Sequence, residues 1–174
     1  MPTRTRKIRN KLPRASRPHM PGYGVPTAGK GLLPWSWAKR RLEESHNYWI
    51  TTVRPDGAPH TMIVWGLWLE GWFCFSTGQQ SRKARNLAEN PRCIVCTECA
   101  DEAVIVEGEA SQAADPQLLH AFFRKYEKKY NFDMSAFRDE PVFVLRPCVA
   151  FGLPEKRFPK AVTRWRFSST DRPS

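Results

Sequence analysis

The residues best suited to chemistry lie in one short segment, 75–91, which reads FSTGQQSRKARNLAENP. Ser81 is a favourable N-cap, so we expect a helix that begins there and stops at Pro91. Arg82 and Lys83 then occupy the first turn, where the helix macrodipole disfavours cations by about 0.3–1 kcal/mol each. Free amides, a hydroxyl and two cations that converge on one point would make an anion site, and we expect phosphate there. Two or three hydrogen bonds to a charged group, at about 1.5–3 kcal/mol each, would outweigh that penalty. The alternative is that both cations are ordinary surface charges.

Further polar groups precede this helix. Ser76 and Thr77 end an apolar segment that is typical of a strand, and Gly78 follows them with a flexible backbone. These hydroxyls would lie beside the start of the helix and could add contacts to the same anion.

A metal site has less support. Three of the five cysteines form C-x-x-C-x-x-C, at Cys93, Cys96 and Cys99. The local sequence RCIVCTEC is typical of a strand, whose side chains alternate between faces, so Cys96 would point away from the other two. Zinc and iron–sulfur sites usually need four converging ligands, and no fourth is obvious nearby. We therefore predict small buried fillers and no metal site.

Three segments read as helices. Trp35, Ala38 and Leu42 have helical spacing and predict an amphipathic helix over 34–44. The segment 81–90 is the second. Asp115 and Pro116 provide an N-cap and a first-turn proline for the third. Its expected apolar face comprises Leu118, Leu119, Phe122, Phe123 and Tyr126, and its expected solvated face comprises Lys125, Lys128 and Lys129.

The remaining periodic segments read as strands. Segments 47–53 and 60–70 flank the turn RPDGAP, and Glu70-Gly71 makes a second turn into 72–77, which predicts a three-strand meander. Further strands are expected at 92–98, 102–110, 142–152 and 161–167. Six or seven mostly sequential antiparallel strands with peripheral helices predict a mainly β protein that closes into a small barrel, because closure removes exposed edges.

The length of 174 residues fits one compact domain. We expect an arm at 1–31, a barrel domain at 32–168 and a polar tail at 169–174. The net charge is +11, and residues 1–17 contribute seven basic residues and no acid. The arm is expected to be flexible and solvated, with a contact to nucleic acid or to an acidic cofactor as the alternative; Met20 as the true start is a further alternative. Without an apolar run of ~20 residues or a signal-peptide core, we expect no membrane association and a cytoplasmic protein.

Several motifs together carry a family resemblance. They are T-V-R-P-D-G-A-P-H (52–60), V-W-G-L-W (64–68), F-S-T-G-x-x-S-R-K-A-R-N-L (75–87), N-P-R (90–92) and V-x-V-E-G (104–108). From about residue 33 to 167, the chain resembles the flavin-binding split-barrel superfamily, which comprises pyridoxamine 5′-phosphate oxidase-like proteins and their deazaflavin (F420)-dependent relatives. The resemblance implies an antiparallel split β-barrel of the FMN-binding type. It also implies a homodimer with the cofactor at the subunit interface.

The resemblance also assigns residues. It implies that Arg82 and Lys83 bind the cofactor phosphate, with Ser81, Ser76 and Thr77 beside them. The family's ring-binding segment falls on Met62, Ile63, Val64 and Trp65. This chain departs from the family pattern in having Met62 in place of an arginine and Ala103 in place of a glutamine.

The C-terminal segment departs further from the vitamin B6 oxidase. The oxidase motif R-L-H-D-R corresponds here to R-W-R-F, 164–167, so Arg164 keeps the arginine and Arg166 replaces the histidine. Both arginines become candidates for binding an anionic substrate other than vitamin B6 phosphate. Packing of Trp165 and Phe167 in a final strand is the alternative role for this segment.

The function that follows is a two-electron oxidoreductase that acts on a small substrate. FMN is the expected cofactor and F420 the alternative. His60 is more often an edge residue than a base, and no Ser-His-Asp or paired-carboxylate pattern occurs, which suits an enzyme whose cofactor performs the hydride chemistry. We assign no catalytic residue. The rival functions are a non-catalytic flavin or haem-type binder and, with less support, a nucleic-acid-associated protein.

Overall fold

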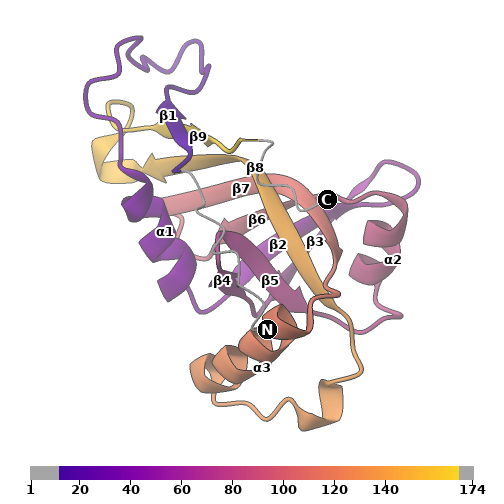
Figure 1. Cartoon of the computed structure of the whole chain (residues 1–174). Helices are drawn as coiled ribbons and strands as arrows, with labels where there is room; N and C mark the ends of the chain where they lie inside the picture. Colours follow the sequence, from indigo (N-terminus) through magenta and orange to yellow (C-terminus); the bar gives the residue numbers. More distant parts are fainter. Residues whose placement is uncertain (1–11, 169–174) are drawn as a thin grey trace, which may run out of the picture.

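The computed structural model describes residues 12–168, which form a mainly antiparallel β structure with peripheral helices (Figure 1). Within these residues the strands are β1 (Arg14–Ser16), β2 (Tyr48–Val53), β3 (Pro59–Val64), β4 (Leu67–Leu69), β5 (Trp72–Ser76), β6 (Arg92–Thr97), β7 (Glu102–Gln112), β8 (Val142–Pro154) and β9 (Thr163–Arg166). The helices are α1 (Trp35–Glu44), α2 (Arg82–Glu89) and α3 (Pro116–Tyr130), with 3₁₀ turns at Ser135–Phe137 and Glu155–Arg157. The predicted helices and strands are thus confirmed, apart from two differences described below.

The strands form one sheet in the order β1-β9-β8-β7-β6-β2-β3. The long strand β8 curves the sheet because its two halves have different partners: residues 142–145 pair with β5, and residues 149–152 pair with β9. A register shift between Glu107 and Gly108 on β7 adds to this curvature. At Gly108 an added Cβ would overlap the carbonyl of Arg146, so the bulge requires glycine.

Two apolar cores occupy opposite faces of β5. Phe73 and Phe75 point into the larger core, which also contains Tyr48, Ile50 and Trp165. Cys74, between the two phenylalanines in sequence, points the other way into a smaller core beneath α3, which comprises Leu67, Leu69, Leu118, Phe122, Phe123, Tyr126, Tyr130, Met134, Val142 and Val144. The helical apolar face predicted from spacing is therefore the face that α3 buries.

The predicted middle strand, 60–70, is broken in two at Trp65-Gly66. Its first part, β3, pairs with β2, and its second part, β4, pairs with β5. At the break Gly66 lies against the ring of Phe73, and an added Cβ would overlap that ring and lie 2.9 Å from the carbonyl oxygen of Cys74. Sequence periodicity does not predict the break because residues on both sides of it favour strands.

Part of the predicted arm belongs to the sheet, which corrects the domain boundary at residue 31. Arg14–Ser16 forms β1 and pairs with β9 at the sheet edge (Figure 1). Arg17 then donates hydrogen bonds to the carbonyl oxygens of Val162 (2.8 Å) and Lys30 (2.6 Å). Backbone hydrogen bonds and the side chain of Arg17 hold this segment in place. Its sequence therefore lacks the alternating apolar residues from which a strand is predicted. Residues 1–11 and the predicted tail, 169–174, lie outside the described residues.

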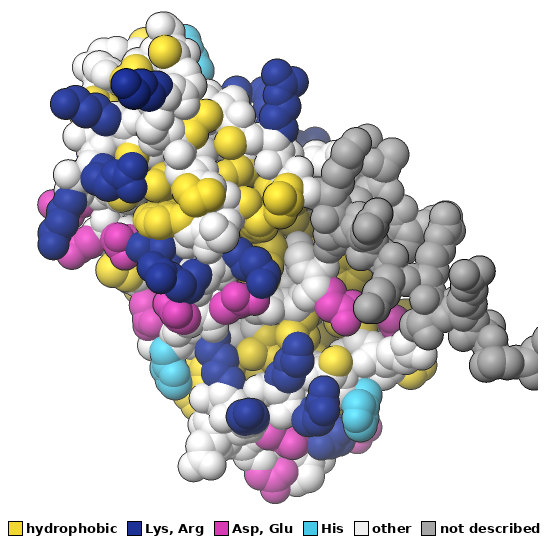
Figure 2. Space-filling model, turned by 60° about the vertical axis from the view of Figure 1, so that its left-hand side comes forward, with side chains coloured by type: hydrophobic (Ala, Val, Ile, Leu, Met, Phe, Trp, Pro, Cys, Tyr) yellow, Lys and Arg dark blue, Asp and Glu magenta, His cyan; other side chains and the backbone are white. Residues whose placement is uncertain are grey.

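The surface charge is mixed on the face that Figure 2 presents, where Lys and Arg side chains alternate with Asp and Glu. On α1 this mixing takes the form of i,i+4 pairs, Lys39 with Glu43 and Arg40 with Glu44. Such exposed pairs contribute only about 0.3–0.5 kcal/mol each to stability. None of the helices in the described part of the chain is long and apolar enough to cross a membrane.

Candidate functional site: a basic cluster beside α2

The start of α2 is built as predicted. Ser81 is the N-cap, and its Oγ accepts a hydrogen bond from the backbone N–H of Ala84 at 3.1 Å. The hydroxyl of Thr77 donates to the same Oγ at 3.1 Å. The helix therefore begins with Arg82 and Lys83 in its first turn, and the cap holds that turn in place.

Replacing Ser81 with alanine is expected to lower the free energy of unfolding by about 1 kcal/mol, because the amide of Ala84 loses its acceptor. Urea denaturation measures the change. Ser81→Thr, which keeps a capping hydroxyl, is the control and should retain most of the stability. Equal losses in both variants would contradict a capping role.

The face of α2 that carries Arg82 and Lys83 is turned toward the β2–β3 hairpin. Asn86, one turn further along the same face, is fully buried and donates from Nδ2 to the Oγ1 of Thr52 on β2 at 2.9 Å. Lys83 is half-buried on this side, and burial lowers the pKa of its ammonium group. Among the described residues no salt bridge involves Arg82 or Lys83.

Two further basic residues lie on this side of the hairpin. His60 is the direct cross-strand partner of Thr52, so both side chains share one face of the β2–β3 pair. Arg54 lies two residues beyond Thr52, where the hairpin turn begins. Burial lowers the pKa of His60. The positive charges of Arg54, Lys83 and Arg82 are near enough to lower it further. We refer to Arg54, His60, Arg82 and Lys83 as the basic cluster.

Two buried polar atoms at this place have no hydrogen-bond partner within the described part of the chain. They are Nδ1 of His60 and Oδ1 of Asn86. Buried polar atoms are almost always paired, so unpaired ones beside a group of cations indicate a place for a ligand. Nothing in the local sequence marks Arg54 and His60 as residues of this site. The register across the turn was the signal that could have found them, because it places His60 opposite Thr52.

The hydroxyls of Ser76 and Thr77, which were predicted to contact the anion, donate hydrogen bonds within the protein. The Ser76 hydroxyl donates to the carbonyl oxygen of Pro141 at 3.3 Å, and the Thr77 hydroxyl donates to Ser81. The carboxylate of Glu140 accepts from the backbone N–H of Gln79 at 2.8 Å. These contacts fix the loop before α2, while the oxygens of both hydroxyls can still accept hydrogen bonds.

The predicted ring-binding segment divides into exposed and buried residues. Met62 and Ile63 are 48% and 52% exposed, and Val64 is buried in the core. Trp49, the cross-strand partner of Ile63, is also exposed. Ile63 and Trp49 therefore share one face of the β2–β3 hairpin and form an exposed apolar patch, which we call the apolar patch. Met62 is exposed on the opposite face, where its cross-strand partner is Ile50.

Trp65 is held from two sides. Its ring stacks on that of Tyr130, with centroids 4.6 Å apart and planes inclined by 5°. Its indole N–H donates to the side-chain oxygen of Asn47 at 3.2 Å. The Tyr130 hydroxyl accepts from the backbone N–H of Gly66 at 2.8 Å and lies 2.8 Å from the Gly66 carbonyl oxygen. Helix α3 thus fixes the break between β3 and β4 and, with it, the end of the ring-binding segment.

Lys129 corrects the prediction of a solvated lysine face on α3. It is half-buried, with Nζ 2.8 Å from the Tyr48 hydroxyl and 3.3 Å from the carbonyl oxygen of Gly66. Burial lowers the pKa of Lys129 to about 8. The neighbouring Lys125 and Lys128 are exposed, as predicted.

Tyr130→Phe is expected to lower the free energy of unfolding by about 1–3 kcal/mol, because the buried N–H of Gly66 loses its acceptor. Thermal and urea denaturation measure this loss. Tyr126→Phe is the matched control, because the Tyr126 hydroxyl makes no hydrogen bond in the described part of the chain. A loss as large in Tyr126→Phe would show that the hydroxyl contacts of Tyr130 are not the cause.

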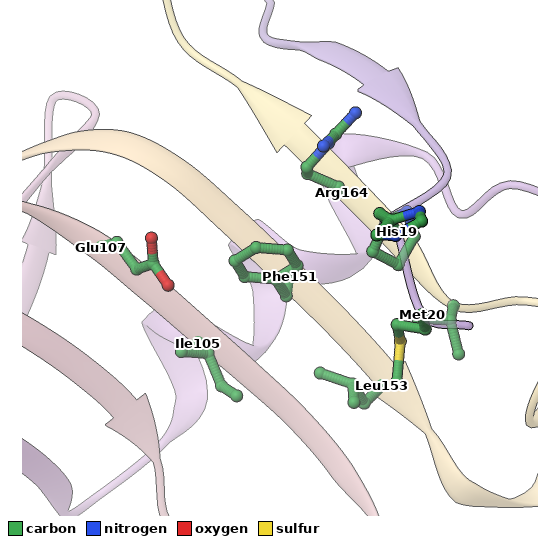
Figure 3. A pocket seen from close by; sticks show the side chains of 9 residues that line it. His19, Met20, Ile105, Glu107, Phe151, Leu153 and Arg164 are labelled. Carbon is green, nitrogen blue, oxygen red and sulfur yellow. The ribbon is translucent and has the colours of Figure 1, made fainter. Parts of the chain in front are cut away.

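The two candidate substrate arginines have different surroundings. Arg164 lines a cavity of about 400 Å³ on the outer face of β7–β9, and its Nε donates to the Ser16 hydroxyl at 3.1 Å. Figure 3 shows Arg164 and Glu107 on opposite sides of Phe151. The other lining residues are Pro18, His19, Met20, Ile105, Leu153 and Val162. Arg166 is exposed and does not line this cavity.

One chain does not bring the basic cluster and Arg164 together. The order β3-β2-β6-β7-β8-β9 separates β3 from β9 by five strand spacings, or about 24 Å along the sheet. Figure 1 also places α2 and β9 on different sides of the molecule. The predicted phosphate site and the candidate substrate residue Arg164 therefore lie at separate places on one chain.

The three cysteines of the C-x-x-C-x-x-C motif do not share one environment. Cys93 is buried, Cys96 is half-buried and Cys99 is exposed. The filler interpretation therefore holds for Cys93 and not for Cys99. Within residues 12–168, no group of three or more His, Cys, Asp or Glu residues is arranged to hold a metal ion.

Comparison with known proteins extends these observations. A family model described as pyridoxamine 5′-phosphate oxidase matches residues 38–150. This range contains the basic cluster and segment 62–65, while Arg164 and Arg166 lie outside it. No curated protein matches the chain.

Solved structures share its fold. An F420 reductase is 24% identical, with a TM-score of 0.55 over 64% of this chain and 94% of that one. A putative pyridoxamine 5′-phosphate oxidase from Listeria innocua is 19% identical, with a TM-score of 0.57 over 66% of this chain and 94% of that one. A heme binding protein from Mycobacterium smegmatis is 20% identical, with a TM-score of 0.59 over 70% of this chain and 55% of that one. The predicted split-barrel fold is confirmed.

Proposed function

Because the chain belongs to the pyridoxamine 5′-phosphate oxidase family, we propose that it is an oxidoreductase that uses a flavin-type cofactor. It passes two electrons, as a hydride, to or from a small substrate. FMN is the first candidate for the cofactor and F420 the second. The observation that carries this proposal is the basic cluster, which lies inside the matched range and has the composition of a phosphate site.

The cluster fits a phosphate group on physical grounds. Placing several cations close together, with one of them half-buried, costs free energy unless a bound anion neutralises their charge. Of the two unpaired atoms at this place, Nδ1 of His60 can donate to an anion when it carries a proton, whereas Oδ1 of Asn86 can only accept. Arg82 and Lys83 would hold the phosphate, and the capped start of α2 would add its free amides.

The ring system of the cofactor would lie on segment 62–65. Met62 and Ile63 supply exposed apolar contacts, and the stacking of Trp65 on Tyr130 fixes the end of the segment. When bound, the cofactor supplies the hydride chemistry, and the protein supplies binding, orientation and exclusion of water.

A homodimer would complete the site. The basic cluster and Arg164 are too far apart in one chain for one small cofactor and its substrate to meet both. A two-fold pairing would bring the Arg164 cavity of one subunit to the cofactor of the other, and the apolar patch would be covered at the interface. Sedimentation equilibrium tests the assembly: a monomer at micromolar concentration would contradict this arrangement.

The substrate is proposed to be a small anion other than vitamin B6 phosphate. Arg164 is available in its cavity for an anionic group, but Arg166 stands where the oxidase has histidine and lies outside that cavity. A non-catalytic haem-type binder is the second candidate function, because a heme binding protein shares the fold.

The visible spectrum of the purified protein, with mass spectrometry of the small molecule that it releases, tests the proposal. Released FMN, or FMN taken up on titration, supports the first candidate, and released F420 supports the second. A haem spectrum without turnover of any donor–acceptor pair supports the binding protein. A colourless protein that takes up none of the three overturns the proposal.

A further inference from the structure

We propose that His60 is a proton-linked part of the basic cluster: it takes up a proton when an anion binds among Arg54, Arg82 and Lys83, so that binding tightens as the pH falls. This inference rests on the proposed phosphate site. It adds a fourth group to that site and makes its occupancy depend on pH.

The register of the hairpin places His60 at the site. Thr52 faces α2, because its hydroxyl accepts a hydrogen bond from the buried Asn86. His60 is paired directly with Thr52, so its imidazole lies on the face of the hairpin that α2 covers. Arg82 and Lys83 precede Asn86 by four and three residues and lie on the same side of that helix.

The imidazole has an open position for a new contact. Its Nδ1 is buried and has no hydrogen-bond partner within the described residues. A neutral imidazole can donate from only one ring nitrogen, whereas the protonated ring donates from both. An anion held by the neighbouring cations would therefore gain a donor by protonation of His60.

The charges around His60 determine the sign of the effect. Burial, followed by Arg54 on the turn and by Lys83 and Arg82 on α2, lowers the pKa of His60 in the absence of an anion. Within the described part of the chain, none of the groups that shift this pKa is a carboxylate. The carboxylate of Asp56, in the hairpin turn, accepts a hydrogen bond from the backbone N–H of Ala58 at 3.0 Å.

A bound anion reverses this balance. It neutralises the cations and attracts the imidazolium, so the pKa of His60 rises. Between the lower pKa of the free protein and the higher pKa of the complex, binding takes up a proton. Affinity therefore increases as the pH falls through that interval and is independent of pH above it.

Sulfate is the probe for the test, because its charge is constant across the relevant range, whereas a phosphate monoester itself titrates near pH 6. The pKa of each histidine is measured by NMR on the full-length protein, in sulfate and in chloride of matched ionic strength. We expect sulfate to raise the pKa of His60 by about one unit, which corresponds to about tenfold tighter binding of sulfate to the protonated form. His120, exposed on α3, should not respond.

Two variants separate the proton linkage from the anion site. In His60→Gln, sulfate should still bind, but its dissociation constant should no longer change between neutral and mildly acidic pH; His120→Gln should keep the dependence of the wild-type protein. In Arg82→Ala/Lys83→Ala, the pKa of His60 should rise without any anion, and sulfate should not raise it further.

Two results would overturn the inference. One is a His60 pKa that is the same in sulfate and chloride. The other is a dissociation constant for sulfate whose pH dependence survives in His60→Gln. Neither result touches the proposed function, which depends on whether the protein binds a flavin-type cofactor and is decided by the spectrum.

Discussion

Arg82→Ala/Lys83→Ala is expected to weaken cofactor binding by at least about a hundredfold. Each cation is positioned to make a charge-assisted hydrogen bond to phosphate, and each such bond contributes about 1.5–3 kcal/mol. The loss of two therefore costs about 3 kcal/mol or more, which corresponds to about two orders of magnitude in Kd. The effect is this large because the site is partly desolvated, as the lowered pKa of Lys83 indicates. Titration of the purified variant with FMN and with F420, followed by fluorescence, measures it.

The control for this variant removes the same net charge elsewhere. Arg124 and Lys125 are exposed on α3, and Arg124→Ala/Lys125→Ala should bind cofactor within about threefold of the wild-type protein. The cap at Ser81 is intact in both variants, so both should fold. If the Arg82/Lys83 variant also stays within about threefold, the proposed phosphate site is wrong.

Gly66→Ala is expected to lower the free energy of unfolding by about 3 kcal/mol, at the upper end of the range for overpacked cores. The new methyl group would overlap the ring of Phe73, which is fully buried in the larger core. It would also lie 2.9 Å from the carbonyl oxygen of Cys74. Relief would require the break between β3 and β4 to shift, which would disturb the hydrogen bonds between Gly66 and the Tyr130 hydroxyl. Urea denaturation measures the loss of stability.

The same substitution should weaken cofactor binding in the fraction that folds, because segment 62–65 ends at this break. Gly29→Ala is the control. There the nearest atom to an added Cβ is Cδ1 of Leu32 at 3.7 Å, an ordinary contact, so little change is expected. A Gly66→Ala protein that is as stable as Gly29→Ala and binds cofactor normally would show that the break does not position the segment.

Local chemistry determined much of this protein. The N-caps at Ser81 and Asp115 and the apolar face of α3 depend on residues within a few positions of one another, and the structure has all of them as predicted. Arg82 and Lys83 are candidate phosphate ligands on local grounds as well, since cations are disfavoured in the first turn of a helix and their presence at a capped helix start indicates a function. The motifs of segments 52–60 and 75–87 then carried the family and its split-barrel fold.

The tertiary structure alone decided which distant residues join that site. His60 and Arg54 enter the basic cluster because of the β2–β3 register and because Asn86 docks α2 on Thr52. Neither relation is encoded in a short stretch of sequence.

Packing and strand order decided the rest. Lys129 looks like a surface residue in sequence, and it is half-buried because Tyr48 and Gly66 lie beneath it. Segment 14–16 carries no strand pattern, yet it pairs with β9 because that strand offers a free edge. The strand order separates Arg164 from the basic cluster. The sequence determines helix caps, turns and the apolar faces of helices, since these depend on residues that are near neighbours in the chain. A functional site depends on contacts between residues far apart in the chain, and only the folded structure brings these together.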